Sequence, residues 1–215
     1  MPNIKHHLTD KLLLAYATGA LPEAFNLVIA THVSMCDECR ASLESIEAVG
    51  GALLSDAPVA AMDASALDRA LARVAESTPI MDASPSAKSG VLPPPLRDYV
   101  GGDLEAVRWR GFGIGVRQAV LKTSKRATVR LLHIPAGQSV PDHGHRGTEL
   151  TLVLQGAFRD DQDRFARGDI EIADETHQHT PVAEEGEDCI CLAATDAPLR
   201  FTGLLPRVAQ RVLGI

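Results

Sequence analysis

The stretch GQSVPDHGHRGTELTLVLQG, residues 137–156, places two histidines and a glutamate at fixed positions between two glycines. His143 and His145 are two residues apart, so on a β-strand both side chains point to the same face. Glu149 lies six residues beyond His143, an even offset that gives it the same face in an extended segment. Gly156 allows a tight turn into a following strand. The spacing therefore predicts a metal site carried on short strands.

This pattern, G-x5-H-x-H-x3-E-x6-G, resembles the first sequence motif of the cupin family at every fixed position. The resemblance implies a β-barrel and a second motif that begins with glycine and has a histidine eleven residues later. Gly168 and His179 occupy those positions. The proline and glycine usual between them are replaced by Asp174 and Thr176, and the closing asparagine is replaced by Ala183. These departures affect the turn geometry and leave the histidine in register.

Two histidines could supply the fourth ligand of the barrel site. His177 is two residues before His179 and shares its face on an extended segment, but register favours His179. Three histidines and one glutamate suit Zn, Mn, Fe or Ni. Cys189 and Cys191 also share one strand face, either as small core residues or as thiols open to oxidation near the metal, and the core interpretation is favoured.

A second cluster lies near the amino end, where His32, Cys36 and Cys39 have the spacing H-x3-C-x2-C. Two thiolates three residues apart can bind one ion from a turn and the start of the next helix, and His32 can face the same point. Structural zinc sites are closed by four protein ligands, so the fourth is expected from His6 or His7. We prefer His7 because it is closer to the first helix. The alternative is that the cysteines are core residues and the histidines lie on the surface.

Around this cluster the sequence predicts short amphipathic helices over residues 8–76. Leu8, Leu12 and Tyr16 define the first helix, with a stop at Gly19, and the second follows Pro22. The third is expected to follow Cys36 and to end at Gly50-Gly51. A fourth, capped by Ser65, has an apolar stripe of Leu67, Leu71 and Val74. A bundle of this size buries little surface, so zinc would supply the stability that the core lacks.

The spacing of hydrophobic residues changes from helical to strand-like after residues 77–97, a segment rich in Ser, Pro and Ala. Within this segment, Pro93-Pro94-Pro95 is expected to be extended. Beyond it, strand-like runs cover residues 116–120, 127–134, 150–154 and 170–172. We therefore predict an α plus β, two-domain chain. Residues 1–85 form a zinc-binding helical domain, 86–97 a linker and 98–215 a cupin barrel.

Composition limits the functions that are open to this chain. Of 215 residues, 45% are hydrophobic and 23% charged, as in folded proteins, and the net charge is -7, which disfavours direct nucleic-acid binding. Residues 1–85 hold 5 Lys/Arg against 11 Asp/Glu, which suits a basic protein partner. There is no apolar run of about 18 residues and no signal peptide, so we expect a cytoplasmic protein with reduced cysteines and no membrane partner.

The N-terminal pattern resembles the zinc-binding anti-sigma domain, and the two motifs in this order are similar to ChrR-type transcriptional regulators, which are anti-sigma factors with a C-terminal cupin. The resemblance spans nearly the whole chain outside the linker. It implies that the helical domain inhibits an extracytoplasmic-function sigma factor, and that the cupin mediates release in response to singlet oxygen or organic hydroperoxide. It also implies a structural zinc ion at His7, His32, Cys36 and Cys39, and a sensory metal, zinc or another divalent ion, at His143, His145, Glu149 and His179.

This interpretation predicts a regulator with no catalytic residues, and two alternatives compete with it. A cupin site with iron and open coordination positions can act as a dioxygenase, but a metabolic dioxygenase has no need of the N-terminal zinc module. A zinc-finger DNA-binding protein with a ligand-binding cupin is disfavoured by the acidic N-terminal half.

Overall fold

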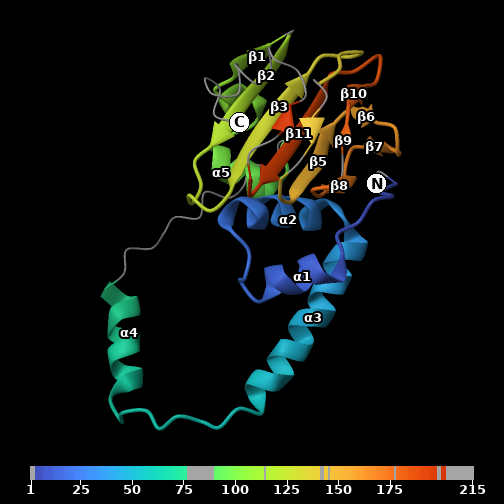
Figure 1. The fold of residues 1–215 in the computed structure, drawn as a ribbon. Coiled ribbons are helices and arrows are strands. Elements are labelled where there is room, and N and C mark those ends of the chain that lie inside the picture. The colour runs from blue at the N-terminus through green and yellow to red at the C-terminus, as the bar shows by residue number, and fades with distance from the viewer. Residues whose placement is uncertain are drawn as a thin grey trace.

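A helical N-terminal part and an antiparallel β-barrel make up the computed structural model (Figure 1). The structure describes residues 3–76, 90–113, 115–140, 143–144, 146–176, 178–197 and 200–201, with side chains left undescribed at 113, 143, 200 and 201. The helices in these ranges are α1 (Asp10–Ala17), α2 (Glu23–Met35), α3 (Asp37–Ser55), α4 (Ala66–Glu76), α5 (Pro94–Val100) and a 3-10 turn at Leu104–Ala106. None of them combines the length and the apolar character that crossing a bilayer requires.

The strands form three antiparallel sheets. Their bounds are β1 (Arg110–Gly113), β2 (Val116–Leu121), β3 (Thr128–Ile134), β4 (His143–Gly144), β5 (Glu149–Gln155), β6 (Ala157–Arg159), β7 (Arg164–Ala166), β8 (Ile170–Ala173), β9 (Gln178–His179), β10 (Val182–Ala183), β11 (Cys189–Thr195) and β12 (Arg200–Phe201). The six-stranded sheet has the order β1-β2-β3-β11-β5-β8, and the smaller sheets are β10-β6-β7 and β12-β4-β9. The four strand runs expected from the sequence are β2, β3, β5 and β8.

Within the large sheet, the neighbouring strands β5 and β11 are buried on both faces, in agreement with the small and apolar residues that make up most of β11 and the middle of β5. On β11, Cys189 and Cys191 point into the barrel interior with Val153 and Phe158. The alternate residues, such as Leu192, join a second core shared with the helices. One sheet therefore fills the barrel on one side and supports the helical part on the other.

Helix α2 is the link between the two parts, because it is buried almost all round. Phe25, Val28 and Ile29 are at most 3% exposed. α2 contacts α1 and α3 on one side, and α5, β5 and β11 on the other, where it lies under the end of the barrel (Figure 1). By contrast α4 has no buried residue and stands apart from α1–α3, so the expected fourth bundle helix does not pack with the others.

Two expectations about helix ends were wrong. The third helix does not end at Gly50-Gly51 but runs to Ser55, because this part of α3 is exposed and a helix tolerates glycine there at a cost of about 1 kcal/mol each. The Pro93-Pro94-Pro95 segment is not extended throughout, because α5 begins at Pro94. Proline is compatible with a first helical turn, where its missing N–H has no intrahelical partner.

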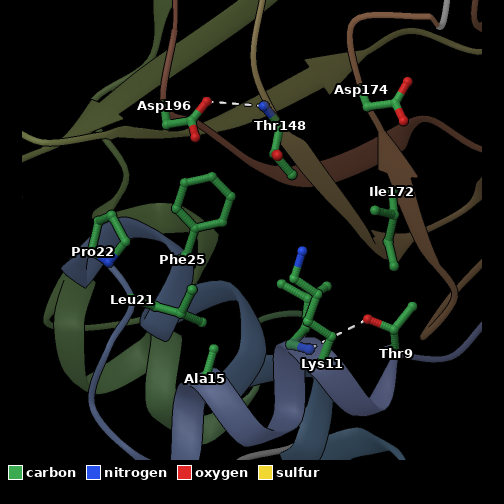
Figure 2. Close-up of a pocket in the computed structure, with 11 residues that line it drawn as sticks. Thr9, Lys11, Ala15, Leu21, Pro22, Phe25, Thr148, Ile172, Asp174 and Asp196 are labelled. Atoms are coloured by element: carbon green, nitrogen blue, oxygen red, sulfur yellow. Dashed lines mark hydrogen bonds between the residues drawn. The ribbon is translucent and has the colours of Figure 1, made fainter.

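The junction between the helices and the barrel is incompletely packed on one side. A pocket of about 350 Å³ lies there, and Leu12 is one of its lining residues. Leu21 and Phe25 line it from the helical part, and Ile172 and Asp174 line it from the barrel (Figure 2). Most of its lining is apolar. The contact between the two parts therefore depends on α2 and on the segment before α1.

Candidate metal centres

The first candidate metal centre brings together His7, His32, Cys36 and Cys39. Their ligand atoms all lie within 4.8 Å of one another. His32 Nε2 is 3.2 Å from Cys39 Sγ, and His7 Nδ1 is 3.3 Å from Cys36 Sγ and 3.7 Å from Cys39 Sγ. A tetrahedron with zinc bonds of 2.0 to 2.3 Å needs ligand atoms about 3.5 Å apart, so this donor set fits zinc.

The turn between α2 and α3 positions three of these side chains. Cys36 has extended backbone angles, ends α2 and caps α3, where its Sγ accepts a hydrogen bond from the Cys39 N–H at 3.4 Å. The Cys36 N–H donates to the His32 carbonyl one helical turn earlier, at 2.9 Å. His32, Cys36 and Cys39 are at most 2% exposed, so the thiols and the ring are shielded from water.

His7, and not His6, reaches this cluster. His7 lies just before α1, and its Nε2 is 3.4 Å from the Glu38 carboxylate while Nδ1 faces the thiols. The His6 ring turns the opposite way, toward the barrel residues Asp163 and Phe165. Adjacent residues in an extended segment point to opposite sides, so the two histidines have different neighbours.

Burial sets the protonation of this cluster. Burial lowers the pKa of His32 to about 4, despite the nearby Gly168 backbone, which acts in the opposite direction. Burial also raises the pKa of the Cys39 thiol to about 11. At neutral pH His32 is therefore an unprotonated ring ready to bind an ion, whereas Cys39 carries a proton that an ion must displace.

Metal affinity at this centre is expected to fall steeply with decreasing pH. The Cys39 thiol, with its pKa raised to about 11, must lose its proton to bind an ion and so contributes about a tenfold fall in affinity per pH unit between about pH 8 and 6. His32, with its pKa near 4, adds nothing in this window. Competition titrations with a chromogenic chelator at several pH values measure the slope. A flat profile would show that the Cys39 thiol is not a ligand.

The second candidate centre involves residues of the barrel strands β4, β5 and β9. In the backbone register, His143 on β4 is the direct antiparallel partner of His179 on β9. Glu149 begins β5, is 9% exposed, and its charge acts on His179. The predicted ligand His145 and the rival ligand His177 lie outside the described residues.

The structure adds two carboxylates that we did not predict. His179 Nδ1 lies 3.0 Å from Glu171 Oε1 and 3.1 Å from Asp160 Oδ2, and the donor atoms of the three residues lie within 4.8 Å of one another, so that the two carboxylates orient the His179 ring. Glu171 stands between two isoleucines on β8, so in the sequence it resembles a solvent-facing strand residue. Asp160 lies in a polar turn. Neither offers a local signal, because only closure of the barrel brings them to His179.

These carboxylates control the charge on His179. Burial alone would lower its pKa, but the contacts with Glu171 and Asp160 and the charge of Glu149 outweigh burial and raise the pKa to about 9. Burial raises the pKa of Glu171. A divalent ion would replace the proton on His179, and because Nδ1 contacts the carboxylates, Nε2 is the nitrogen that we expect to bind an ion. The carboxylate oxygen of Glu149 and the ring nitrogen of His179 are donors that fit such an ion.

Cys189 and Cys191 lie inside the barrel, on one strand face as expected. Both are at most 1% exposed, and their sulfur atoms are 3.5 Å apart. The contact with Cys189, together with burial, raises the pKa of the Cys191 thiol, so it is protonated. They pack with apolar residues, in agreement with the core interpretation.

Comparisons with known proteins identify the family to which the chain belongs. Residues 98–198 match the family described as ChrR Cupin-like domain, which confirms the predicted cupin barrel. The anti-sigma-E factor ChrR of Cereibacter sphaeroides is 60% identical over 214 residues, covering 96% of this chain and 97% of that protein. The crystal structure of Rhodobacter sphaeroides SigE in complex with the anti-sigma ChrR matches with a TM-score of 0.80 and 57% identity, over 90% of this chain and 100% of that one.

The fold therefore joins a small helical domain, which has a zinc-compatible cluster of side chains, to a cupin barrel. Identity over nearly the full length of both proteins then makes the assignment specific: the chain belongs to the ChrR family of anti-sigma factors.

Proposed function

We propose that this protein is an anti-sigma factor that binds an extracytoplasmic-function sigma factor through its N-terminal zinc domain and keeps it inactive in the cytoplasm. Support comes from the relative ChrR, an anti-sigma-E factor, and from a related structure that contains SigE bound to ChrR. The further part of the proposal is that the cupin mediates release in response to singlet oxygen or organic hydroperoxide, without catalytic turnover.

The observation that carries the proposal is an apolar surface on α3 and α4. The second half of α3 and the whole of α4 have large apolar side chains that are each between 57% and 77% exposed: Val49, Leu53, Leu54, Leu67, Leu71 and Val74. Exposed apolar side chains gathered on helices in this way are typical of a protein-binding site. On α4 the side chains recur at i, i+4 and i+7, which is the anchor pattern of a helix that lies in a partner's groove.

Charge adds a second argument for a protein partner. Residues 1–85 carry 11 acidic side chains against 5 basic ones, so the apolar surface is set in an acidic domain. Such a surface is complementary to a basic, helical protein and repels nucleic acid. The zinc ion at His7, His32, Cys36 and Cys39 would hold α1, α2 and the start of α3 together and so orient the exposed half of α3.

The direct test is co-expression with a candidate extracytoplasmic-function sigma factor from the same genome, followed by co-purification, metal analysis and transcription assays in vitro. We expect a stable one-to-one complex that contains zinc and that silences the promoters of the sigma factor. Free sigma activity in the presence of excess purified protein would refute the proposal.

The sensory role of the cupin makes a separate prediction. His145→Ala should leave sigma inhibition within about twofold, because the helical domain is intact, but should reduce the response to singlet oxygen or hydroperoxide by about tenfold or more, as expected when a metal ligand is lost. A reporter for the sigma factor, measured with and without the stimulus, gives both values. His133→Ala is the matched control, because His133 contacts Asp188 and Trp109 on the outside of the barrel. A normal response from His145→Ala would exclude this site as the sensor.

A further inference from the structure

The segment before α1 is attached to the barrel rather than to the helices that follow it. The Lys5 and His6 N–H groups both donate to Asp169 Oδ1, at 2.6 and 3.0 Å, and the Ile170 N–H donates to the His6 carbonyl at 3.3 Å. Ile4 packs against Gly168, where an added Cβ would meet its side chain at 2.7 Å. This segment, residues 4–6, therefore follows the turn between β7 and β8 and directly precedes the candidate zinc ligand His7.

The His6 ring is held by the barrel as well. Its Nε2 lies 3.0 Å from Asp163 Oδ2, its Nδ1 lies 3.6 Å from Asp169 Oδ1, and the ring packs on Phe165 at 4.4 Å between centroids. Because His6 and His7 are adjacent, holding the backbone and the ring of His6 in place restricts where the His7 backbone, and so the base of its side chain, can lie.

Asp163 belongs to a turn that reaches the second metal centre. Asp160 Oδ1 accepts the N–H groups of Gln162 and Asp163, both at 2.9 Å, and so fixes the turn. The other oxygen of the same carboxylate, Oδ2, lies 3.1 Å from His179 Nδ1, and the Asp160 side chain is 2% exposed. One buried carboxylate therefore orders the turn with one oxygen and positions a candidate cupin ligand with the other.

These contacts form a continuous path between the two centres. We propose that the turn Asp160–Asp163 mechanically couples the cupin metal site to the N-terminal zinc site, through His179, Asp160, Asp163 and His6 to His7. Each non-covalent step is a contact of 2.9 to 3.1 Å. In this arrangement Asp160 and His6 are positioning residues, each placing a ligand without binding the ion itself.

The inference rests on the proposed function for its biological meaning, because it supplies a route by which a change at the cupin reaches the sigma-binding domain. When His179 moves, Asp160 loses a partner on one oxygen, and the turn that presents Asp163 to His6 loses part of its restraint. The pocket on the other side of the junction leaves that side loosely packed, so the helical part is restrained mainly by α2 and by this segment.

The test measures loss of metal from the N-terminal centre alone. The full-length chain is loaded with cobalt(II), and the thiolate-to-cobalt absorption, which only a site with cysteine ligands gives, is followed after a chelator is added in excess. His179→Ala acts at the cupin end of the path and Asp163→Ala at the zinc end. Asp161→Ala is the matched control, because Asp161 is an exposed aspartate in the same turn that does not lie on the path.

We expect His179→Ala and Asp163→Ala each to accelerate cobalt loss about tenfold, the size typical of lost outer-shell contacts, and Asp161→Ala to have no effect. The double variant should be no faster than either single variant, since both changes interrupt one path, whereas independent effects would multiply to about 100-fold. If His179→Ala does not fold, Asp160→Asn replaces it, because the amide oxygen still caps the turn while its NH2 group cannot accept from His179.

Unchanged release in His179→Ala or Asp160→Asn, or a multiplicative double variant, would overturn the coupling. Binding of the sigma factor by the wild-type chain is measured separately. A wild-type chain that does not bind it would refute the proposed function and leave the release kinetics fully interpretable, so the two failures are distinguishable.

Discussion

Cys39→Ser is expected to remove one zinc ion per chain and to weaken sigma-factor binding by at least about 100-fold. Cys39 Sγ lies 3.2 Å from His32 Nε2 and 3.7 Å from His7 Nδ1, at the centre of the cluster. A structural zinc site contributes about 10 to 16 kcal/mol in small zinc-dependent domains, which is more than a short helical bundle can recover from its own core. Metal analysis and a binding titration against the purified sigma factor measure the two effects.

The control for this variant is Cys189→Ser, which removes a thiol that is equally buried but lies in the barrel interior. It should keep the N-terminal zinc and the sigma affinity, even where the buried hydroxyl lowers the melting temperature of the barrel. Zinc-free Cys39→Ser that still folds its helices and still silences the sigma factor would contradict the role assigned to the ion.

Leu71→Glu on α4 is expected to weaken sigma-factor binding by about 100-fold while leaving the melting temperature unchanged. Leu71 is 57% exposed and α4 has no buried residue, so the substitution breaks no packing within the chain. In a complex the same side chain would be buried, and placing a carboxylate there costs the apolar contact plus the desolvation of a charge. A binding titration and a thermal melt of the free protein separate the two effects.

Ala72→Glu provides the matched control. It adds the same charge to the next residue of the same exposed helix, about 100° around the axis from the apolar stripe. Binding within about twofold of wild type is expected. An equal loss of affinity in both variants would mean that added charge is responsible, and unchanged binding in Leu71→Glu would exclude α4 from the interface.

Features that depend on local spacing could be predicted from the sequence. The H-x3-C-x2-C pattern placed His32, Cys36 and Cys39 together, because a helix end and a helix start fix their separation within one turn. The strands β2, β3, β5 and β8 were expected from their apolar runs. Gly156 has a positive φ of 66° at the turn from β5 to β6, and an added Cβ there would meet the Asp188 carbonyl at 2.8 Å, so the expected tight turn depends on glycine.

Other features depended on which surfaces meet, and no local pattern contains that information. His6 and His7 are equivalent in spacing, and only the position of the barrel turn against the segment before α1 directs His6 to Asp163 and His7 to the thiols. Asp160 and Glu171 reach His179 from positions that are 19 and 8 residues earlier in the chain, through barrel closure.

The sequence by itself determined the two metal-ligand patterns and the helical and strand character of the two parts, because these follow from periodicity and from residue chemistry within about ten positions. The tertiary structure alone decided that α2 is buried between the two parts, that α4 leaves its apolar stripe exposed, and that one buried carboxylate touches both an ordered turn and His179. Packing and burial are properties of surfaces in contact, and residues distant in sequence share them only after the chain has folded.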